Sequence, residues 1–357
     1  MKKMLIIGPF PPLFSYGGPT KSVKGLYDVF SQTDIQCSVL SPNTHLNRTK
    51  YIEINLNKDI IFCKNQFTYL INNSHKFDVI WLNSLFDLKI ILLCLIKAFT
   101  NFHLIVSPRG QLSSQAISTS KPLLKNFFLK ILFFFKSNLI FHSTSISESE
   151  NISFFFKKTR VKMISNIFSL NYNSNLVTDR KFVFYSRIHK KKGLDILLKT
   201  IKKYNLKIDL DIYGFIEDKR YWELCTSLFK NHPKVEYKGV IEDGDVSKLK
   251  DKYSFFILPT LNENFGHVII ELLSIGCIPI ISKDTTPFDE QISSVFNLNF
   301  NLHSQSNLNN VLNQAINMSN DDLVVLKSLV KPCFEKIDKM QEKNKKEYIK
   351  FVNDLII

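Results

Sequence analysis

Two carboxylates, Glu263 and Glu271, lie in a segment that follows a short apolar run and precedes an apolar helical pattern. The run, Phe255–Leu258, is typical of a buried strand, and the pattern predicts a helix over Val268–Ile275. The first amides of a helix attract phosphate, and a glycine such as Gly266 allows close backbone approach. We therefore expect phosphate to bind at this loop, while the carboxylates accept hydrogen bonds from sugar and ribose hydroxyls. The alternative is that Glu263 caps the helix and Glu271 is merely exposed.

A second segment of the same kind carries two cations, Arg187 and Lys192. The apolar run Phe182–Tyr185 predicts a strand that ends just before Arg187, and a helix is expected directly after Lys192. Two cations at one edge of a sheet can hold a diphosphate without a metal ion. The alternative is that the run Lys190–Lys192 is only a solvated turn. We expect Lys192, like Glu271, to lie at an exposed rim of the binding site.

These motifs occur in a characteristic order. An Arg-x4-Lys-Gly motif is followed along the chain by Glu-x7-Glu and then by Gly276-Cys-Ile-Pro279. Together with Gly214 and Gly239, this order resembles the large family of retaining glycosyltransferases with the GT-B fold, called family 4 or group 1. The resemblance covers nearly the whole chain and is most specific over residues 181–290.

Two shorter motifs resemble a subset of that family, whose members attach sugars to bacterial surface-polysaccharide precursors. They are Ser107-Pro108-Arg109-Gly110 and Thr286-Pro287-Phe288. In the subset the second motif abuts the nucleotide, which implies a stacking role for Phe288.

The resemblance implies a role for each matching residue. Arg187 and Lys192 would stabilise the leaving diphosphate of a nucleotide sugar, because fixed cations favour the charge that develops as the glycosidic bond breaks. Glu271 would bind the ribose, and Glu263 the transferred sugar. The residues expected to bind the nucleotide sugar are Gly17, Gly18, Gly214, Asn264, Phe265, Gly266, His267, Val268, Glu271 and Thr286. No metal ion and no cofactor is expected.

The N-terminal half carries three further candidates. Gly17 and Gly18 lie in the proline-rich loop Gly8–Thr20, which the resemblance brings near donor phosphate and acceptor; the alternative is a simple turn. Arg109 stands where many relatives carry a catalytic histidine. Because arginine cannot act as a base at neutral pH, we expect Arg109 to bind an acceptor phosphate or donor charge. The lone His142 is expected to be structural.

Short apolar runs alternate with helical patterns along the chain, which predicts parallel sheets covered by helices. The strands expected are Met4–Ile7, Gln36–Leu40, Val79–Leu82, His103–Ser107, Leu139–His142, Lys162–Ser165, Phe182–Tyr185, Ile208–Tyr213, Val235–Lys238, Phe255–Leu258, Ile278–Ile281 and Val295–Leu298. The helices expected are Thr20–Phe30, Leu85–Phe99, Pro122–Lys136, Glu148–Phe155, Gly193–Tyr204, Lys219–Lys230, Asp245–Lys252, Val268–Ile275, Ser304–Met318, Asp321–Val330 and Glu335–Ile357.

This alternation predicts an α/β protein, and the resemblance makes it GT-B, with two doubly wound Rossmann-like domains facing across a cleft. A polar segment over 166–180 is typical of a linker. We expect an acceptor-binding domain over 1–175 and a nucleotide-sugar domain over 176–334. The helix over 335–357 is expected to pack back on the N-terminal domain.

Composition excludes several classes of protein. The 357 residues are 45% hydrophobic and 22% charged, which is typical of a globular protein. The six cysteines are scattered without a CxxC pair, which indicates reduced thiols in the cytoplasm rather than a disulfide framework or a zinc site. The N-terminal residues are typical of a strand, not of a secretory signal. The apolar run Ile90–Phe99 is too short and too charged to span a bilayer.

The net charge of +15 is unevenly distributed. Residues 1–175 contain 20 of the Lys and Arg residues and only 8 of the Asp and Glu residues, a net charge of +12. A basic N-terminal half favours an anionic partner. The alternative is that the whole chain is simply rich in lysine. Helix Lys121–Lys136 is rich in both phenylalanine and lysine, which favours peripheral binding to an anionic membrane; a buried helix with lysines that reach solvent is the alternative.

We therefore expect a metal-independent, retaining glycosyltransferase that moves a hexose from a nucleotide-diphosphate sugar to a carbohydrate acceptor. A lipid-linked acceptor in bacterial polysaccharide, O-antigen or capsule biosynthesis, at the inner face of the cytoplasmic membrane, fits the resemblance. Two alternatives stay open: a nucleotide-sugar epimerase of the same fold, and a non-catalytic basic binding protein. Nucleic acid is not an expected partner, because no recognition motif is present.

Overall fold

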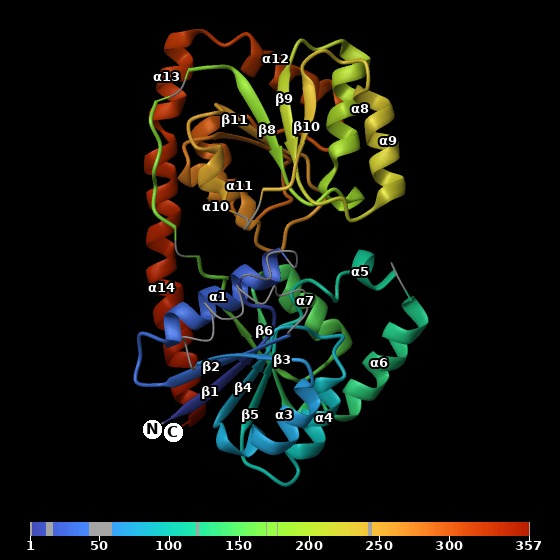
Figure 1. The fold of residues 1–357 in the computed structure, drawn as a ribbon, viewed down its shortest axis with the longest axis vertical. Helices are drawn as coiled ribbons and strands as arrows, with labels where there is room; N and C mark the ends of the chain where they lie inside the picture. The colour runs from blue at the N-terminus through green and yellow to red at the C-terminus, as the bar shows by residue number, and fades with distance from the viewer. Residues whose placement is uncertain are drawn as a thin grey trace. The chain divides into compact units, whose positions relative to one another are not determined.

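The structure is a computed structural model that describes residues 2–11, 17–42, 59–118, 121–168, 170–176, 178–241 and 245–356. The chain divides into two compact units (Figure 1). Unit 1 contains residues 1–169 and 341–357, and unit 2 contains residues 170–340. Residues 12–16 of the proline-rich loop lie outside the described residues.

Unit 1 contains a sheet of seven parallel strands in the order β3-β2-β1-β4-β5-β6-β7. The strands are β1 (Lys3–Ile7), β2 (Gln36–Pro42), β3 (Ile60–Cys63), β4 (Val79–Leu82), β5 (His103–Val106), β6 (Leu139–Ser143) and β7 (Arg160–Met163). The central strands β4 and β6 are buried along their whole length, as expected for parallel strands with helices on both faces.

Alternate residues of these strands point to opposite faces of the sheet, and each face has its own apolar core. On one face, Met4 and Ile6 pack in a cluster with α1 (Gly18–Phe30) and the end of α14 (Val330–Ile356). On the other face, Leu5 and Ile7 pack in a cluster with four helices. These are α3 (Gln66–Asn73), α4 (Lys89–Ile96), α6 (Pro122–Phe134) and α7 (Ile146–Phe155); the short α5 (Ser114–Ser118) precedes α6.

The last residues of the chain are part of the unit 1 core. Tyr348, Phe351, Val352 and Leu355 of α14 are all buried in the cluster that contains strand β1. Tyr348 Oη also lies 2.9 Å from His142 Nε2. The first fold element and the last therefore depend on each other, although they lie at opposite ends of the sequence.

A buried polar chain runs through this core. Trp81 Nε1 donates to Ser107 Oγ at 2.8 Å, and Ser107 Oγ lies 2.9 Å from His142 Nδ1. His142 Nε2 lies 2.9 Å from the carbonyl oxygen of Ile164. A neutral imidazole with its proton on Nε2 satisfies every one of these contacts. Burial, and then the charge of Arg109, hold the pKa of His142 well below 6.5. His142 is therefore a structural residue, as its sequence context indicates.

Unit 2 contains five parallel strands in the order β10-β9-β8-β11-β12. The strands are β8 (Lys181–Tyr185), β9 (Asp209–Tyr213), β10 (Val235–Gly239), β11 (Phe255–Leu258) and β12 (Ile278–Ile281). The helices are α8 (Leu194–Tyr204), α9 (Lys219–Phe229), α10 (His267–Ser274), α11 (Asp289–Phe296), α12 (Gln305–Ile316) and α13 (Asn320–Ser328), followed by the start of α14. The predicted α/β class with two doubly wound parallel sheets is confirmed.

Several predicted elements are wrong in type or position. No strand forms over Val295–Leu298: Val295 and Phe296 end helix α11, which has two acidic residues in its first turn, and the left-handed Asn297 follows it. The helix expected over Asp245–Lys252 is only a single 3-10 turn over Val246–Leu249. Strand β3 and helices α3 and α5 had not been predicted, and β7 begins two residues before its predicted start.

No helix among the described residues is long and apolar enough to cross a membrane.

Removal of one core side chain from α14 should destabilise unit 1. Phe351→Ala would leave a cavity in the cluster around β1 and should lower the free energy of unfolding by about 3–5 kcal/mol. Urea unfolding followed by circular dichroism measures this change. The control is Lys350→Ala, an exposed neighbour, which should change stability by less than about 0.5 kcal/mol. Equal effects of the two variants would show that α14 does not stabilise unit 1.

The free energy of unfolding of unit 1 should decrease as the pH is lowered, because of His142. Its pKa is lowered in the folded state, so the unfolded state binds the proton first as the pH falls below 6.5. The stabilisation is complete above pH 6.5 and should be lost at up to about 1.4 kcal/mol per pH unit below it. His142→Gln should flatten this slope between pH 6.5 and 5 in urea unfolding.

The control for this pH effect is His103→Gln. Burial is also the largest cause that lowers the pKa of His103, but its side chain is only partly buried, so the slope should change less. An unchanged slope in His142→Gln would contradict the assignment.

Candidate active site

The strand order of unit 2 places two loops side by side. Strands β8 and β11 are neighbours in the sheet, with Phe182 paired to Phe255, although β9 and β10 separate them in the sequence. Ligands of open α/β sheets bind at such a switch point, beyond the carboxyl ends of the strands. The loop after β8 carries Arg187 and Lys192, and the loop after β11 carries Glu263.

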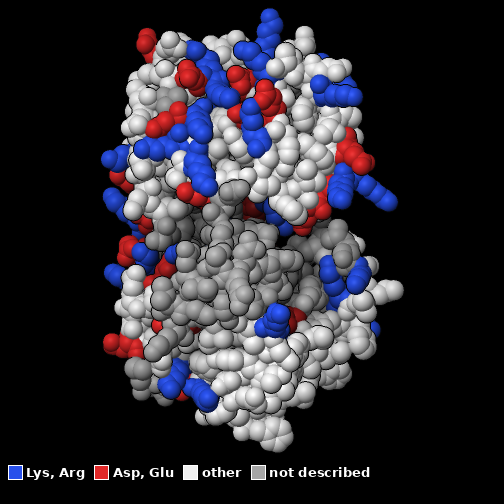
Figure 2. Space-filling model, in the orientation of Figure 1, with Lys and Arg blue, Asp and Glu red and all other residues white. Residues whose placement is uncertain are grey.

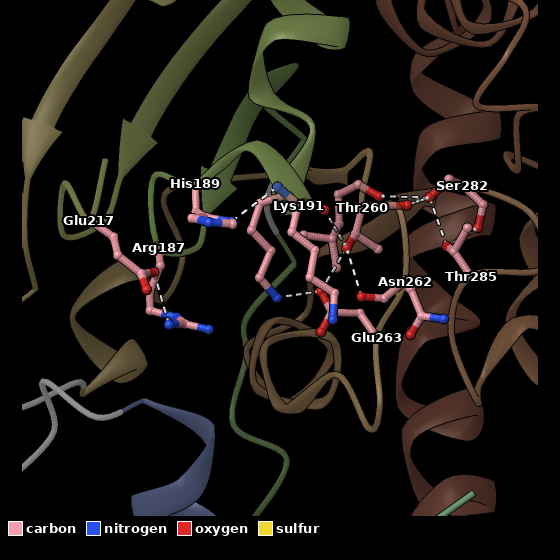
Figure 3. A network of polar contacts seen from close by, with 11 residues as sticks. Arg187, His189, Lys191, Glu217, Thr260, Asn262, Glu263, Ser282 and Thr285 are labelled. Carbon is pink, nitrogen blue, oxygen red and sulfur yellow. Dashed lines mark hydrogen bonds and ion pairs between the residues drawn. The ribbon is translucent and has the colours of Figure 1, made fainter. Parts of the chain in front are cut away.

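Lys192 and Glu263 form an ion pair between these loops. Lys192 Nζ lies 2.5 Å from Glu263 Oε1, and the two side chains are only 13% and 10% exposed. Thr260 Oγ1 donates to the same carboxylate oxygen at 2.9 Å (Figure 3). The expectation that Lys192 lies at an exposed rim is therefore wrong, because the loop after β11 covers it. Lys190 alone fits the alternative of a solvated turn.

Hydrogen bonds fix the positions of three loops at this edge of the sheet. Leu261 N donates to the carbonyl oxygen of Lys191 at 2.9 Å and joins the loops after β11 and β8. Glu263 N donates to the carbonyl oxygen of Thr285 at 2.6 Å, and Ser282 Oγ donates to that of Thr260 at 2.7 Å. The loop after β12 thus holds the Glu263 loop from its other side (Figure 3).

Arg187 lies in the same loop as Lys192 but is exposed. Its Nη1 lies 2.9 Å from Glu217 Oε2, and the side chains of this pair are 48% and 40% exposed. An exposed ion pair contributes only about 0–1 kcal/mol, so Arg187 can exchange Glu217 for another anion at little cost. Sequence reasoning had missed Glu217; its only signal is its place in the loop that begins at Gly214.

A third cation, Lys191, belongs to this cluster. Burial lowers the pKa of Lys191, Glu263 opposes that change, and the positive charges of Lys192 and Arg187 lower it further. Three cations thus lie close enough to affect one another, with two carboxylates, Glu217 and Glu263, as their partners. An incoming anion would relieve this repulsion, which makes the cluster a suitable place for a diphosphate.

The end of the Glu263 loop forms the start of α10. Gly266 is the residue before the helix, with a φ of 82°, and no side chain caps the first turn. The alternative that Glu263 caps this helix is therefore wrong. The first amides of α10 belong to the expected phosphate-binding residues Gly266, His267 and Val268.

Two buried aromatic rings pack against each other beside the loop that carries Glu263. Phe265 and Phe288 are both buried and meet edge to face, with ring centroids 5.2 Å apart. Phe288 is therefore committed to packing within unit 2, which argues against the predicted stacking on a nucleotide. The neighbouring Asn264 and Thr286 are partly buried, and Thr286 Oγ1 accepts from Phe288 N at 3.3 Å.

Glu271 faces a pocket rather than open solvent. It is 6% exposed, so the expectation of an exposed rim position and the alternative of a merely exposed residue are both wrong. The pocket has a volume of about 240 Å³ and is lined by Leu170, Asn171, Asn173, Asp245, Val246, Ser247, Glu271, Ser274 and Ile275. Burial, with Glu271 and Asp245 nearby, raises the pKa of Tyr185 at the end of β8.

Gly214 serves the close approach of two loops. Its φ is 149°, and a Cβ at this position would lie 1.7 Å from the carbonyl oxygen of Ser186. Any side chain would push the loop after β9 away from the loop that carries Arg187. The glycine is thus explained by packing, whether or not it also contacts a ligand.

The unit 1 candidates lie at the carboxyl edge of their own sheet. Gly17, with a φ of 63°, is the residue before helix α1, and Gly18 begins that helix. Arg109 has a φ of 54° and donates to Asn83 Oδ1 from Nη2 at 2.6 Å and from Nε at 3.2 Å. A further guanidinium nitrogen donates to Asn166. Burial is the largest cause of a lowered pKa at Arg109.

Metal ligation receives no support from the described residues, which contain no group of three or more His, Cys, Asp or Glu side chains that could hold an ion. Sequence reasoning had overlooked the Asp209-Leu-Asp211 triplet. Asp211 is buried within β9, where it lies 2.9 Å from Lys181 Nζ and accepts from Tyr253 Oη at 2.6 Å. A second triplet, residues 243–245, lies only partly within the described residues. Metal independence stays a prediction.

Comparisons with known proteins agree with this arrangement. Residues 171–325 match the model of the family described as Glycosyl transferases group 1. No curated protein matches the sequence significantly.

Solved structures of similar fold cover nearly the whole chain. Sucrose-phosphate synthase from Thermosynechococcus elongatus is 15% identical with a TM-score of 0.72, over 99% of both chains. HepE from Anabaena, in complex with UDP and glucose, is 13% identical with a TM-score of 0.76, over 99% of this chain and 100% of that chain. A glycosyltransferase from Rickettsia africae is 14% identical with a TM-score of 0.66, over 98% of both chains.

At such identities the likeness establishes the fold, while the family match covers the segment that contains every unit 2 candidate. The chain therefore has the GT-B fold of glycosyltransferases, and its residues 171–325 match the family described as Glycosyl transferases group 1.

Proposed function

We propose that unit 2 binds the donor, a nucleotide-diphosphate sugar, and that unit 1 binds a carbohydrate acceptor. The observation that carries this proposal is the cluster of Lys191, Lys192 and Arg187, in which Lys192 binds Glu263 and Arg187 binds Glu217, in the loop next to the one that leads into α10. Cations beside the positive end of a helix are suited to a diphosphate. The similar structure of HepE contains UDP and glucose, which supports a donor of this class.

The roles follow from the chemistry of each group. Lys192 and Arg187 would hold the diphosphate after exchanging Glu263 and Glu217 for phosphate oxygens. Glu263, once released, can accept hydrogen bonds from sugar hydroxyls. Glu271 can accept them from ribose hydroxyls in the pocket that it lines.

Catalysis would depend on cations that are already in position before the reaction begins. Negative charge grows on the leaving diphosphate as the glycosidic bond breaks, and fixed cations stabilise that charge without rearrangement. The acceptor attacks from the face that the diphosphate leaves, a phosphate oxygen takes its proton, and the anomeric configuration is retained. No residue of the chain needs to act as a base, in agreement with an arginine at position 109.

The acceptor is a lipid-linked oligosaccharide of bacterial polysaccharide assembly. Arg109 supports this choice, because its guanidinium donates to the neutral amide oxygens of Asn83 and Asn166, and the nearby Glu148 carboxylate accepts from Gly110 N and Thr144. A guanidinium that keeps its charge in a partly buried loop favours an anionic ligand such as the phosphate of a lipid carrier. Catalysis would then take place at the inner face of the cytoplasmic membrane.

Loss of the diphosphate contact should abolish donor binding. Lys192→Met should eliminate the increase in melting temperature that the best nucleotide diphosphate from a UDP, GDP and ADP panel gives, because a ligand stabilises only the state that it binds. Transfer should fall by orders of magnitude, roughly 100-fold or more. Lys202→Met, an exposed lysine on α8, is the matched control and should behave as wild type.

A buried ion pair makes the choice of substitution important. Lys192→Met leaves Glu263 partly buried without its cation, so the double variant Lys192→Met with Glu263→Gln is needed to separate folding from binding. If the folded double variant still showed the full ligand-induced shift, the diphosphate site would lie elsewhere.

Glu271→Gln should weaken binding of the nucleotide more than binding of inorganic pyrophosphate, because pyrophosphate has no ribose. Isothermal calorimetry with both ligands measures the difference, and Glu223→Gln on α9 is an exposed control. Equal losses for the two ligands would contradict a ribose contact.

Proton NMR of the product tests whether the anomeric configuration is retained. Product formed in the absence of an acceptor would indicate an epimerase.

A further inference from the structure

Helix α6 of unit 1 has apolar side chains on two opposite faces. Leu129 and Leu132 are buried, 6% and 0% exposed, and attach the helix to the core. On the outer face, Leu123 and Phe134 are each 83% exposed, and Leu124 and Phe127 are 61% and 63% exposed. We call Leu123, Leu124, Phe127 and Phe134 the α6 stripe. Single exposed apolar residues are ordinary, but a stripe along one helix marks a surface that binds something.

Helix α6, which carries the stripe, is held to the rest of unit 1 by contacts of two lysines. Lys125 Nζ donates to the carbonyl oxygen of Ala116 at 2.6 Å and lies 5.7 Å from the centre of the Phe86 ring. Lys136 Nζ lies over Phe133 and donates to the carbonyl oxygen of Lys157 at 3.2 Å. Contacts near both ends of α6 thus hold the helix to unit 1. Changes to the stripe should therefore leave the core intact.

The sequence segment that contains the stripe carries charge of one sign. Residues 88–147 contain no Asp or Glu, and they contain six lysines and Arg109. Lys130 lies within the exposed face of α6, and Lys121, Lys157 and Lys158 are also exposed. In Figure 2 the described part of unit 1 that is in view is mostly uncharged, with several groups of basic side chains and fewer acidic ones. The partner of this surface is therefore both anionic and able to take up apolar side chains.

The positive charge and the exposed apolar side chains together distinguish between possible partners. A second copy of the chain would bring the same positive charges together, which disfavours self-association. Nucleic acid offers phosphate but no place for leucine side chains. An anionic bilayer interface accepts both, because apolar side chains enter the acyl boundary while lysines remain among the phosphates.

We propose that the α6 stripe docks unit 1 on an anionic lipid surface, with the axis of α6 in the plane of the interface. The four stripe side chains enter the acyl boundary, and Lys130 with its exposed neighbours lies among the phosphates of the headgroups. The biological purpose rests on the proposed lipid-linked acceptor, whereas the binding itself requires neither donor nor acceptor.

Vesicle flotation of the full chain tests this proposal. Wild type should float with phosphatidylglycerol–phosphatidylcholine vesicles, bind pure phosphatidylcholine much more weakly, and lose affinity as salt rises. The variant Phe127→Glu with Phe134→Glu should bind the anionic vesicles at least about tenfold more weakly. The matched control Leu224→Glu with Val325→Glu changes two exposed apolar residues on helices of unit 2 and should bind as wild type.

Three results would overturn the proposal. They are wild type that binds neither vesicle type, a stripe variant that binds like wild type, and a wild-type dimer in size-exclusion chromatography that the stripe variant converts to monomer. Donor binding, measured by the ligand-induced shift in melting temperature, should be equal in wild type and stripe variant. That shift also separates the two proposals: its presence without vesicle binding contradicts only docking, and its absence with vesicle binding contradicts only the donor site.

Discussion

The ion pair between Lys192 and Glu263 depends on the pairing of β8 with β11, and the arrangement of the candidate site depends on that ion pair. Charges that are nearly buried are costly unless each finds its partner with good geometry. Here the geometry comes from the sheet: Leu261 and Glu263 donate backbone hydrogen bonds to loops on either side, and Thr260 holds the carboxylate. Separation of the loops would break this ion pair and the hydrogen bonds that position it.

Close packing of the loops restricts which residues can occupy two positions. A Cβ at Gly193 would lie 1.9 Å from the carbonyl oxygen of Pro259, and one at Gly214 would lie 1.7 Å from that of Ser186. These two glycines let three loops approach within hydrogen-bonding distance. Glycine at these positions therefore has a steric reason that is separate from any contact with a ligand.

Unit 1 is held together differently, by apolar layers and one buried polar chain. Tyr348 from the end of the sequence reaches His142 on β6, and Trp81 reaches Ser107 at the start of the Arg109 loop. Gly110 N also donates to Glu148 Oε1 at 2.6 Å, which fixes that loop from α7. Arg109 is thus positioned by three elements, while the outer face of α6 stays available for a partner.

The sequence by itself determined the alternation of strands and helices, because parallel strands buried on both faces appear as short apolar runs. It also selected as candidates Arg187, Lys192 and Glu263, which follow such runs, and Glu271 in the helix after one of them. It could not reveal the burial of Lys192 and Glu271 or the partner of Arg187, because those depend on which loops the strand order brings together. Val295 and Phe296 were assigned to a strand because apolar residues alone do not separate a strand from the buried face of a short helix. Only the tertiary structure decides such contacts, since they join residues that are distant in the chain and adjacent in the sheet.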